Sequence, residues 1–443
     1  MGGAVEAREQ DGATLPEKWM RGGMALNRIA FHRGIIEGFY GRPWTPAARS
    51  DMLAFARTRG FTHYIYAAKD DPYTRADWRS VPLPADRERW WRQELARAQA
   101  GAMRLGMAIQ PGLDMRFGSA RDRRTLSEKV RYLRDLGLGV LALQFDDIDP
   151  SLSADDARAY GQAANAQADI ARLVHEELRG EAELIFCPTE YWGLRTTPYK
   201  QALRTALPAE IPVFWTGPAV CSETIRGRQA AQAQDLFGHA IMVWDNYPVN
   251  DAGMTAELHL APLEGRDAAL LDTVAGYYTN PMELAEASKV ALVTIAAYLS
   301  DANAYDPVRA WRQALDQWGA DYRASLEDLG WATRFSCCGR GSRWETRLAQ
   351  ARGHALDPEL EDRLRLWAHR GEHAYPPALW PEIAPWAEKL RGLAVRALST
   401  SPTSPPPHGM GPVPADPPNP AGPLVLGGEL ERWIQSRGAS PPG

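Results

Sequence analysis

Long apolar runs are missing from this chain of 443 residues. No stretch reaches the roughly 18 consecutive apolar residues of a membrane-spanning helix. Residues 1–30 are charged and lack the apolar core of a secretory signal. Cysteine is scarce as well, and four cysteines in a chain of this size do not make a disulfide framework. We therefore expect a cytoplasmic protein that does not enter a membrane.

A surplus of basic charge is also missing. The 50 lysines and arginines are outnumbered by 55 aspartates and glutamates, which gives a net charge of −5. No global positive field is present to attract nucleic acid or an anionic membrane, so neither is expected as a partner. Cys337 and Cys338 are neighbours without a second pair at metal-ligand spacing, which argues against zinc. We expect neither a metal nor a cofactor.

What the chain does contain is a regular alternation of short apolar runs with helix-length amphipathic segments. Eight βα units in about 250 residues are what an α/β fold of the (β/α)8 TIM-barrel type requires. A doubly wound open sheet is the alternative, but no glycine-rich phosphate fingerprint follows the first strand. The expected strands are Gly34–Phe39, His63–Ala67, Met107–Gln110, Val140–Phe145, Leu184–Cys187, Val213–Thr216, Ile241–Trp244 and Val274–Tyr278.

The chain divides into four expected parts. Residues 29–283 form the barrel, and residues 284–399 form a smaller all-helical domain, because apolar side chains there follow helical spacing. Seven tryptophans in that domain are expected to anchor its core rather than to stack on sugars. Residues 400–443 are rich in Pro, Gly and Ser and are expected to be disordered, as are residues 1–28. A short helical turn at Leu430–Ile434 is the one exception considered within the tail.

Inside the barrel, a long helix is expected over Asp155–Leu178. Ser153 precedes it and is followed three residues later by Asp156, as in a capping box.

Polar clusters follow the predicted strands, so in a barrel they would meet at one rim, where catalytic residues lie. The strongest cluster is Asp146-Asp147, directly after the apolar run Val140–Phe145. A buried strand has no structural reason to end in two adjacent carboxylates, since each raises the cost of ionising the other. General acid–base chemistry is the leading explanation. A solvated strand end, or an acidic metal site with Asp149, is the alternative.

Seven motifs together closely resemble the O-GlcNAcase family. This is glycoside hydrolase family 84, which includes bacterial β-N-acetylglucosaminidases and some hyaluronidase-like enzymes. The motifs occur in family order and cover the whole predicted barrel. They are GIIEGFYGRPW (34–44), YAAKDDPYTRADWR (66–79), the acid pair at 146–147, FCPTEYWG (186–193), FWTGPAVCSETI (214–225), VWDNYPVND (243–251) and YTNP (278–281).

The resemblance implies hydrolysis of terminal β-linked N-acetylglucosamine (GlcNAc) with retention, the acetamido oxygen of the substrate acting as nucleophile. Such substrate-assisted enzymes are exceptions to the usual pair of carboxylates on opposite faces of the sugar. By motif position, Asp146 accepts the acetamido N–H and stabilises the oxazoline, while Asp147 is the general acid and then the base. We expect the charge of Asp146 to keep a proton on Asp147 nearer neutral pH.

The resemblance also implies further contacts to the sugar. Tyr191 would lie beside the anomeric centre and donate to the acetamido oxygen. The other implied contacts are Lys69 and the backbone of Gly38 at the 3-hydroxyl, Asn246 near the acetamido group or 3-hydroxyl, Asp251 and Asn280 at the 4- and 6-hydroxyls, and Trp244 and Tyr40 as walls of the acetamido pocket.

The sequence therefore predicts a retaining exo-β-N-acetylglucosaminidase that acts on a terminal β-GlcNAc glycoconjugate or glycoside, with a homodimer through the helical domain as an expected assembly. Two alternatives stay open. One is a non-catalytic GlcNAc-binding protein on the same barrel. The other is a metal-dependent barrel lyase that uses Asp146, Asp147 and Asp149 as oxygen ligands.

Overall fold

The computed structural model describes residues 30–101, 103–336, 341–352, 354–400 and 422–438. Eight parallel strands close into a barrel in sequence order, with β1 pairing both β2 and β8. This confirms the (β/α)8 prediction, and every predicted run overlaps an observed strand. The strands are β1 (His32–Glu37), β2 (His63–Tyr66), β3 (Arg104–Ile109), β4 (Val140–Gln144), β5 (Glu183–Cys187), β6 (Val213–Trp215), β7 (Ile241–Asp245) and β8 (Gly276–Thr279).

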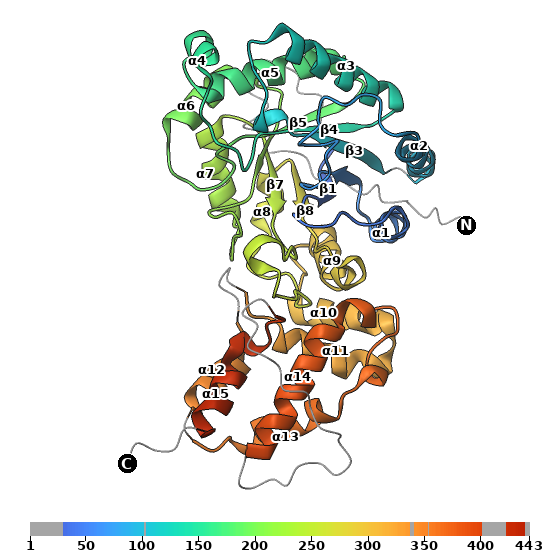
Figure 1. Cartoon of the computed structure of the whole chain (residues 1–443), viewed down its shortest axis with the longest axis vertical. Helices are drawn as coiled ribbons and strands as arrows, with labels where there is room; N and C mark the ends of the chain where they lie inside the picture. Colours follow the sequence, from blue (N-terminus) through green and yellow to red (C-terminus); the bar gives the residue numbers. More distant parts are fainter. Residues whose placement is uncertain (1–29, 102, 337–340, 353, 401–421, 439–443) are drawn as a thin grey trace, which may run out of the picture.

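Helices surround the barrel in the upper part of Figure 1. Local signals start and stop them: Thr45 caps the first helix by accepting the Ala48 N–H, and Gly137 ends the third at a φ of 99°. They are α1 (Pro46–Thr58), α2 (Ala85–Ala100), α3 (Ala120–Leu136), α4 (Ala154–Tyr160), α5 (Ala163–Leu178), α6 (Pro198–Ala206), α7 (Gly227–Phe237), α8 (Ala269–Thr273) and α9 (Ala285–Ser300).

The helix expected over Asp155–Leu178 is two helices, α4 and α5. The Ser153 hydroxyl accepts the Asp156 N–H and caps α4 as expected. Gly161, at a φ of 74°, then ends α4 before α5 begins.

The barrel interior is built in layers, because alternate residues of each strand face inward. The middle layer is apolar and includes Ile36, Ile65, Ala142, Ile185, Phe214 and Tyr278. Continuing each alternation toward the carboxyl ends of the strands reaches a polar layer of Gly38, Lys69, Asp146, Asn246 and Asn280. The same alternation carried toward the amino ends reaches His32, His63 and Glu183. An apolar plug therefore separates two polar layers.

The last helix of the barrel, α9, belongs to two hydrophobic cores. Ala291 and Ile295 pack into the core between sheet and helices, while Ala287 and Val290 pack into the core of the helical domain. The boundary expected at residues 283/284 lies just before α9, so it assigns this shared helix to the helical domain.

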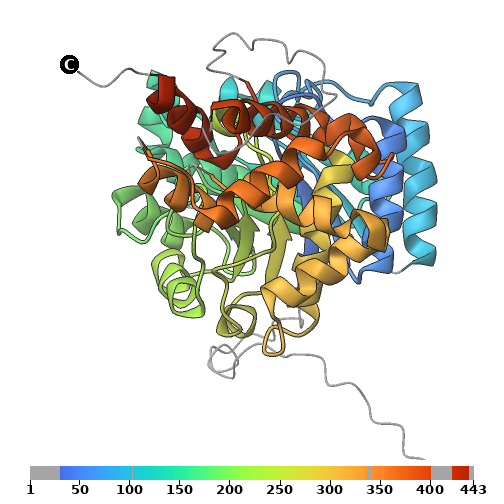
Figure 2. The same ribbon diagram turned by 90° about the horizontal axis from the view of Figure 1, so that it is seen from below.

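The helical domain lies below the barrel in Figure 1 and in front of it in Figure 2. Four of its seven tryptophans are buried core residues as predicted, namely Trp311, Trp344, Trp367 and Trp386. The other three, Trp318, Trp331 and Trp380, are half-buried and pack against that core. Its helices are α10 (Pro307–Leu315), α11 (Arg323–Ala332), α12 (Arg343–Gln350), α13 (Pro358–His369) and α14 (Trp380–Thr400).

The prediction of disorder for the tail is wrong for residues 422–438, whereas the short helical turn considered at Leu430–Ile434 is confirmed and lies within a longer helix. This segment ends in α15 (Glu429–Gly438), which packs against α12 and α14 (Figure 1). Val425, Leu430 and Trp433 are buried in the helical core, and this apolar anchor outweighs the surrounding Pro, Gly and Ser. Residues 1–28, 401–421 and the Cys337-Cys338 pair lie outside the described residues.

Among the helices of the described ranges, none combines the length and apolar character that crossing a bilayer demands.

Candidate active site

All ten predicted site residues lie at the carboxyl end of the barrel. They come from six strands or the loops that follow them: Gly38 and Tyr40 after β1, Lys69 after β2, Asp146 and Asp147 after β4, Tyr191 after β5, Trp244, Asn246 and Asp251 in or after β7, and Asn280 after β8. Hydrogen bonds and one cation–π contact divide the ten residues into two connected groups, and the adjacent residues Asp146 and Asp147 join these groups.

Asp146 is buried, with 7% of its surface exposed. Its Oδ2 accepts a hydrogen bond from the Lys69 ammonium, which also donates to Gln110 Oε1 at 2.9 Å. Its Oδ1 is buried and has no hydrogen-bond partner among the described residues. A buried carboxylate oxygen without a donor costs free energy, so Asp146 offers a ready acceptor for an N–H or O–H of a ligand.

Asp147 is exposed and points into a different environment. Its φ of 53° lies in the left-handed region, which sets its side chain apart from that of Asp146. Tyr191 donates to Oδ1 at 2.7 Å, and Tyr40 donates to Oδ2 at 2.9 Å. Arg75 holds this arrangement by donating to the Tyr40 hydroxyl at 2.9 Å and to the Asp147 carbonyl at 3.1 Å. The two carboxyl groups are thus adjacent in sequence but differ in burial and in partners.

Both tyrosines remain hydrogen-bond donors over the ordinary pH range. Burial raises the pKa of Tyr40 to about 12, and the nearby Asp147 charge adds to the effect. Burial, followed by the charge of Asp147, raises the pKa of Tyr191 still further.

A second chain of contacts runs across the floor of the site. Asn280 Oδ1 accepts the Gly38 N–H at 3.1 Å, and its amide donates to Asn246 Oδ1 at 3.0 Å. Trp244 Nε1 donates to the same Asn246 oxygen at 3.0 Å, and the Lys69 ammonium lies 5.5 Å from the Trp244 ring centroid. Gly38 leaves space for this indole, because a Cβ there would lie 2.5 Å from Trp244 Cζ2.

Asp251 closes the rim beside Tyr40. Its Oδ2 accepts the Tyr40 backbone N–H at 2.7 Å, which ties the loop after β7 to the loop after β1. Burial raises the pKa of Asp251, opposed in part by that backbone hydrogen bond. A cavity of about 270 Å³ opens next to Tyr40 and Asp251 and is completed by Trp386 of α14.

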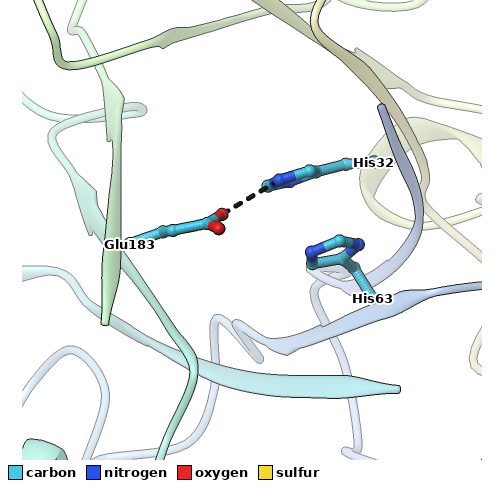
Figure 3. Close-up of side chains that lie close together, drawn as sticks. All are labelled: His32, His63 and Glu183. Atoms are coloured by element: carbon cyan, nitrogen blue, oxygen red, sulfur yellow. Dashed lines mark ion pairs between the residues drawn. The ribbon is translucent and has the colours of Figure 1, made fainter. Parts of the chain in front are cut away.

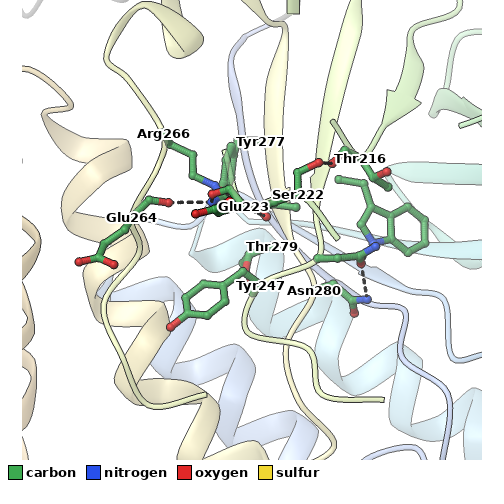
Figure 4. A network of polar contacts seen from close by, with 12 residues as sticks. Thr216, Ser222, Glu223, Tyr247, Glu264, Arg266, Tyr277, Thr279 and Asn280 are labelled. Atoms are coloured by element: carbon green, nitrogen blue, oxygen red, sulfur yellow. Dashed lines mark hydrogen bonds and ion pairs between the residues drawn. The ribbon is translucent and has the colours of Figure 1, made fainter. Parts of the chain in front are cut away.

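Two buried ion pairs hold the loops that carry these residues. After β1, Arg49 donates to both oxygens of Glu37, at 2.7 and 2.8 Å, and the Trp44 N–H donates to Glu37 at 3.1 Å. At the end of β7, Arg266 forms an ion pair with Asp245. Figure 4 shows Arg266 beside Glu223 and Tyr277 in the polar network around this strand end. Asp245 stands between Trp244 and Asn246, so this pair fixes the strand end that presents both.

The structure does not gather the three aspartates of the metal hypothesis. Asp149 Oδ1 accepts the Ser151 N–H at 2.9 Å in a turn before α4. Asp146 is bound by Lys69, and Asp147 by the two tyrosines. In the part of the chain that is described, these carboxylates do not form a cluster with metal-ligand spacing.

Sequence reasoning missed two residues of the site. Arg75 donates to Tyr40 and Asp147, and Gln110 accepts a hydrogen bond from the Lys69 ammonium. Arg75 lies inside the motif 66–79, and Gln110 ends the predicted third strand, so their positions were visible although their partners were not. A pairing across two strands or two loops depends on barrel closure, which local sequence does not show.

Comparisons with known proteins bear on most of the chain. The sequence model of a family described as β-N-acetylglucosaminidase matches residues 33–330. The proteins named protein O-GlcNAcase from Rattus norvegicus and Mus musculus are each 32% identical over 282 residues, which is 62% of this chain and 31% of theirs. This chain therefore spans less than a third of the length of these curated relatives.

Solved structures share the fold. A mutant of the O-GlcNAc hydrolase from Thermobaculum terrenum matches with a TM-score of 0.78 at 28% identity, over 92% of this chain and 94% of that chain. CpGH84B matches with a TM-score of 0.74 at 24% identity, over 83% of this chain and 68% of that chain.

Proposed function

The chain belongs to the β-N-acetylglucosaminidase family that includes the O-GlcNAcases, and we propose that it is a retaining exo-β-N-acetylglucosaminidase. It would release terminal β-linked GlcNAc by substrate-assisted catalysis through an oxazoline intermediate. The observation that carries the proposal is the unlike setting of two adjacent carboxyl groups. Asp146 is buried with one free acceptor oxygen, whereas Asp147 is exposed and held by two phenols.

In the first step the acetamido oxygen of the substrate attacks C1 as the glycosidic C1–O bond breaks. Asp146 Oδ1 accepts the acetamido N–H, which orients the carbonyl oxygen and stabilises the positive charge of the forming oxazolinium. Lys69 holds the other oxygen of Asp146 and fixes its orientation. Asp147, protonated at the start, donates its proton to the leaving oxygen.

In the second step water attacks C1 from the face that the leaving group vacated. Asp147, now a carboxylate, takes a proton from that water, and the C1–O bond of the oxazoline breaks to restore the acetamido group. Two inversions at C1 give overall retention. The Tyr191 hydroxyl donates to Asp147 at 2.7 Å and can turn to the acetamido oxygen beside it.

The remaining residues provide binding and shape. Trp244 and Tyr40 would enclose the acetamido methyl group, and Asn246 would contact the acetamido group or the 3-hydroxyl. Asp251 would accept from the 4- and 6-hydroxyls. Gly38 and Asn280 bond to each other, so we assign them first to holding the floor of the site and then to sugar contacts.

The names of the relatives suggest the aglycone. Protein O-GlcNAcases and an O-GlcNAc hydrolase match this chain, so a GlcNAc-modified serine or threonine is the first substrate to test. A cytoplasmic location and a homodimer through the helical domain complete the proposal. The first fits the free thiol of the buried Cys187, and the second is testable by light scattering of the purified protein.

Hydrolysis of 4-nitrophenyl β-GlcNAc tests the activity, and proton NMR of the first product tests retention. Asp147→Asn should slow poor leaving groups far more than activated ones, because only poor ones need protonation. Asp146→Asn should slow both classes. Reversed behaviour would exchange the two roles. GlcNAc binding without turnover would support a sugar-binding protein, and an inverted product would contradict the substrate-assisted mechanism.

A further inference from the structure

A second group of ionisable side chains lies at the opposite end of the barrel. His32, His63 and Glu183 are the first residues of β1, β2 and β5, and their side chains meet inside the barrel mouth (Figure 3). One ligand atom from each lies within 4.8 Å of the other two. The apolar middle layer separates them from Asp146 and Asp147, so the proposed hydrolase chemistry does not use them.

We propose that His32 Nε2, His63 Nε2 and a Glu183 carboxylate oxygen bind a divalent metal ion of the zinc type. Two imidazoles and one carboxylate are a donor set that zinc takes in proteins, with a fourth position for water. Magnesium and calcium prefer all-oxygen sites and are not expected to bind here. A bound ion would connect β1 and β2 to β5 across the barrel, so it should raise the stability of the fold.

The first support is the state of His63. His63 as a whole is 6% exposed, yet its Nε2 has no hydrogen-bond partner among the residues described in the structure. Its other nitrogen, Nδ1, lies 2.7 Å from the Thr62 hydroxyl. When that hydroxyl donates to the Arg33 carbonyl at 3.4 Å, Nδ1 is the donor and the lone pair lies on Nε2, which is the tautomer that metal binding requires. A buried nitrogen lone pair that accepts no hydrogen bond is available to coordinate a metal ion.

The second support is the state of His32. Its Nε2 lies 2.9 Å from Glu183 Oε2, and its Nδ1 lies 2.9 Å from the Tyr278 hydroxyl. On metal binding, the proton between Nε2 and Glu183 would move to Nδ1, where the Tyr278 oxygen accepts it. A hydroxyl behind each imidazole thus orients the ring, as the outer partners of metal-bound histidines do.

The site also has a route of entry. The Glu183 side chain is 34% exposed, so an ion can arrive from its side. Arg104 donates to the other oxygen of Glu183 and is itself 55% exposed. Its positive charge opposes a cation nearby, which predicts tighter metal binding when Arg104 is replaced by a neutral residue.

Binding requires a small local change. The two imidazoles are stacked, with centroids 3.7 Å apart and planes 15° apart, so their lone pairs run side by side toward Glu183 (Figure 3). Zinc–nitrogen bonds of about 2.0–2.1 Å need converging lone pairs. The His63 ring must therefore tilt about its Cβ–Cγ bond, a movement that histidine NMR resonances would report.

The experiment uses untagged full-length protein stripped with chelator. Calorimetric titration with Zn²⁺ should give one site per chain, and a saturating concentration should raise the melting temperature by about 3–5 °C. His63→Gln should abolish both effects, and Arg104→Gln should strengthen binding severalfold. His239→Gln removes a buried histidine elsewhere and should leave binding unchanged.

Two results would overturn the proposal. One is absence of stoichiometric binding, and the other is binding that persists unchanged in His63→Gln. If that variant does not fold, Co²⁺ added to the unaltered protein decides: a visible spectrum of nitrogen and oxygen ligands with shifted histidine resonances supports the site, and an unchanged spectrum contradicts it. GlcNAc hydrolysis should not respond to the metal, so failure here leaves the proposed activity separately testable.

Discussion

Asp245 and Arg266 form an ion pair in which each side chain is only 1% exposed. Arg266 donates to both carboxylate oxygens, at 2.6 and 2.8 Å, and its remaining N–H groups reach the carbonyls of Ser222, Glu223 and Glu264 (Figure 4). A buried charge with every donor satisfied is costly to break and is a precise way of holding chain segments together. Here the segments are the end of β7 and the loops after β6 and before α8.

Arg266→Met should therefore destabilise the protein by about 3–5 kcal/mol, because it leaves the Asp245 carboxylate buried without its partner. Chemical denaturation followed by tryptophan fluorescence measures this. Arg92→Met breaks a surface ion pair with Glu88 on α2 and should change the stability far less, because solvent screens that pair. If both variants lost the same free energy of unfolding, the buried pair would stabilise the fold no more than the surface pair does.

Gly38→Ala should damage the site without unfolding the barrel. The new Cβ would lie 2.5 Å from Trp244 Cζ2, so the indole that would wall the acetamido pocket has to move. Displacements of about 1 Å at a catalytic site can cost about 100-fold in rate, and we expect a fall in kcat/KM of about 10- to 100-fold for 4-nitrophenyl β-GlcNAc.

Gly253→Ala is the matched control for Gly38→Ala. It lies in the loop after Asp251, and nothing is within 4 Å of a Cβ built there. Its kcat/KM should stay close to that of the parent protein. A comparable fall in both variants would mean that loop stiffness, not the position of Trp244, limits the rate.

The barrel and the location of the site were predictable because local patterns encode them. A short apolar run such as Val140–Phe145 that polar residues end abruptly favours a buried strand, and in a parallel barrel all such strand ends share one rim. Placing Asp146 and Asp147 at that rim needed no knowledge of their partners.

The partners themselves were not predictable, because they depend on closure of the barrel. The Lys69 ammonium reaches both Gln110 and Asp146 only when β2, β3 and β4 lie side by side. The folded segment 422–438 was missed for a different reason. Composition dominated by Pro and Gly hid a few apolar residues, such as Trp433, whose long-range burial against the helical domain stabilises α15.

The phenols of the site should not limit the basic side of the pH–rate profile. Because burial raises the pKa of Tyr40 to about 12, its hydroxyl stays protonated and keeps donating to Asp147 well above neutral pH. Tyr40→Phe should lower kcat, and because it removes a hydrogen bond to the Asp147 carboxylate it should not move the basic limb to lower pH. Measuring kcat/KM against pH for both proteins tests this, and a basic limb moved to lower pH would contradict it.

His239 should make the protein sensitive to mild acid. Burial lowers its pKa from 6.5 to about 4. Between these values the unfolded chain binds a proton that the folded chain does not, so stability is lost as the pH falls through this window. The loss approaches about 3 kcal/mol by pH 4. His239→Gln should flatten the fall measured by denaturation at several pH values, whereas replacing the exposed His354 in the same way should not.

Trp192 should contribute to aglycone recognition. It directly follows Tyr191, whose hydroxyl contacts Asp147, and its large apolar side chain is 47% exposed at the rim. Stacking on an aromatic face is worth about 1 kcal/mol, which corresponds to about fivefold in kcat/KM. We expect Trp192→Ala to lower kcat/KM by this factor for a GlcNAc-modified peptide and to leave hydrolysis of β-GlcNAc fluoride, whose leaving group has no bulk, almost unchanged.

Leu366→Ala removes an equally exposed apolar side chain from the helical domain and should affect neither substrate. If kcat/KM fell equally on both substrates, Trp192 would instead act by positioning Tyr191. Only a contact with the aglycone would slow the peptide substrate and not the fluoride.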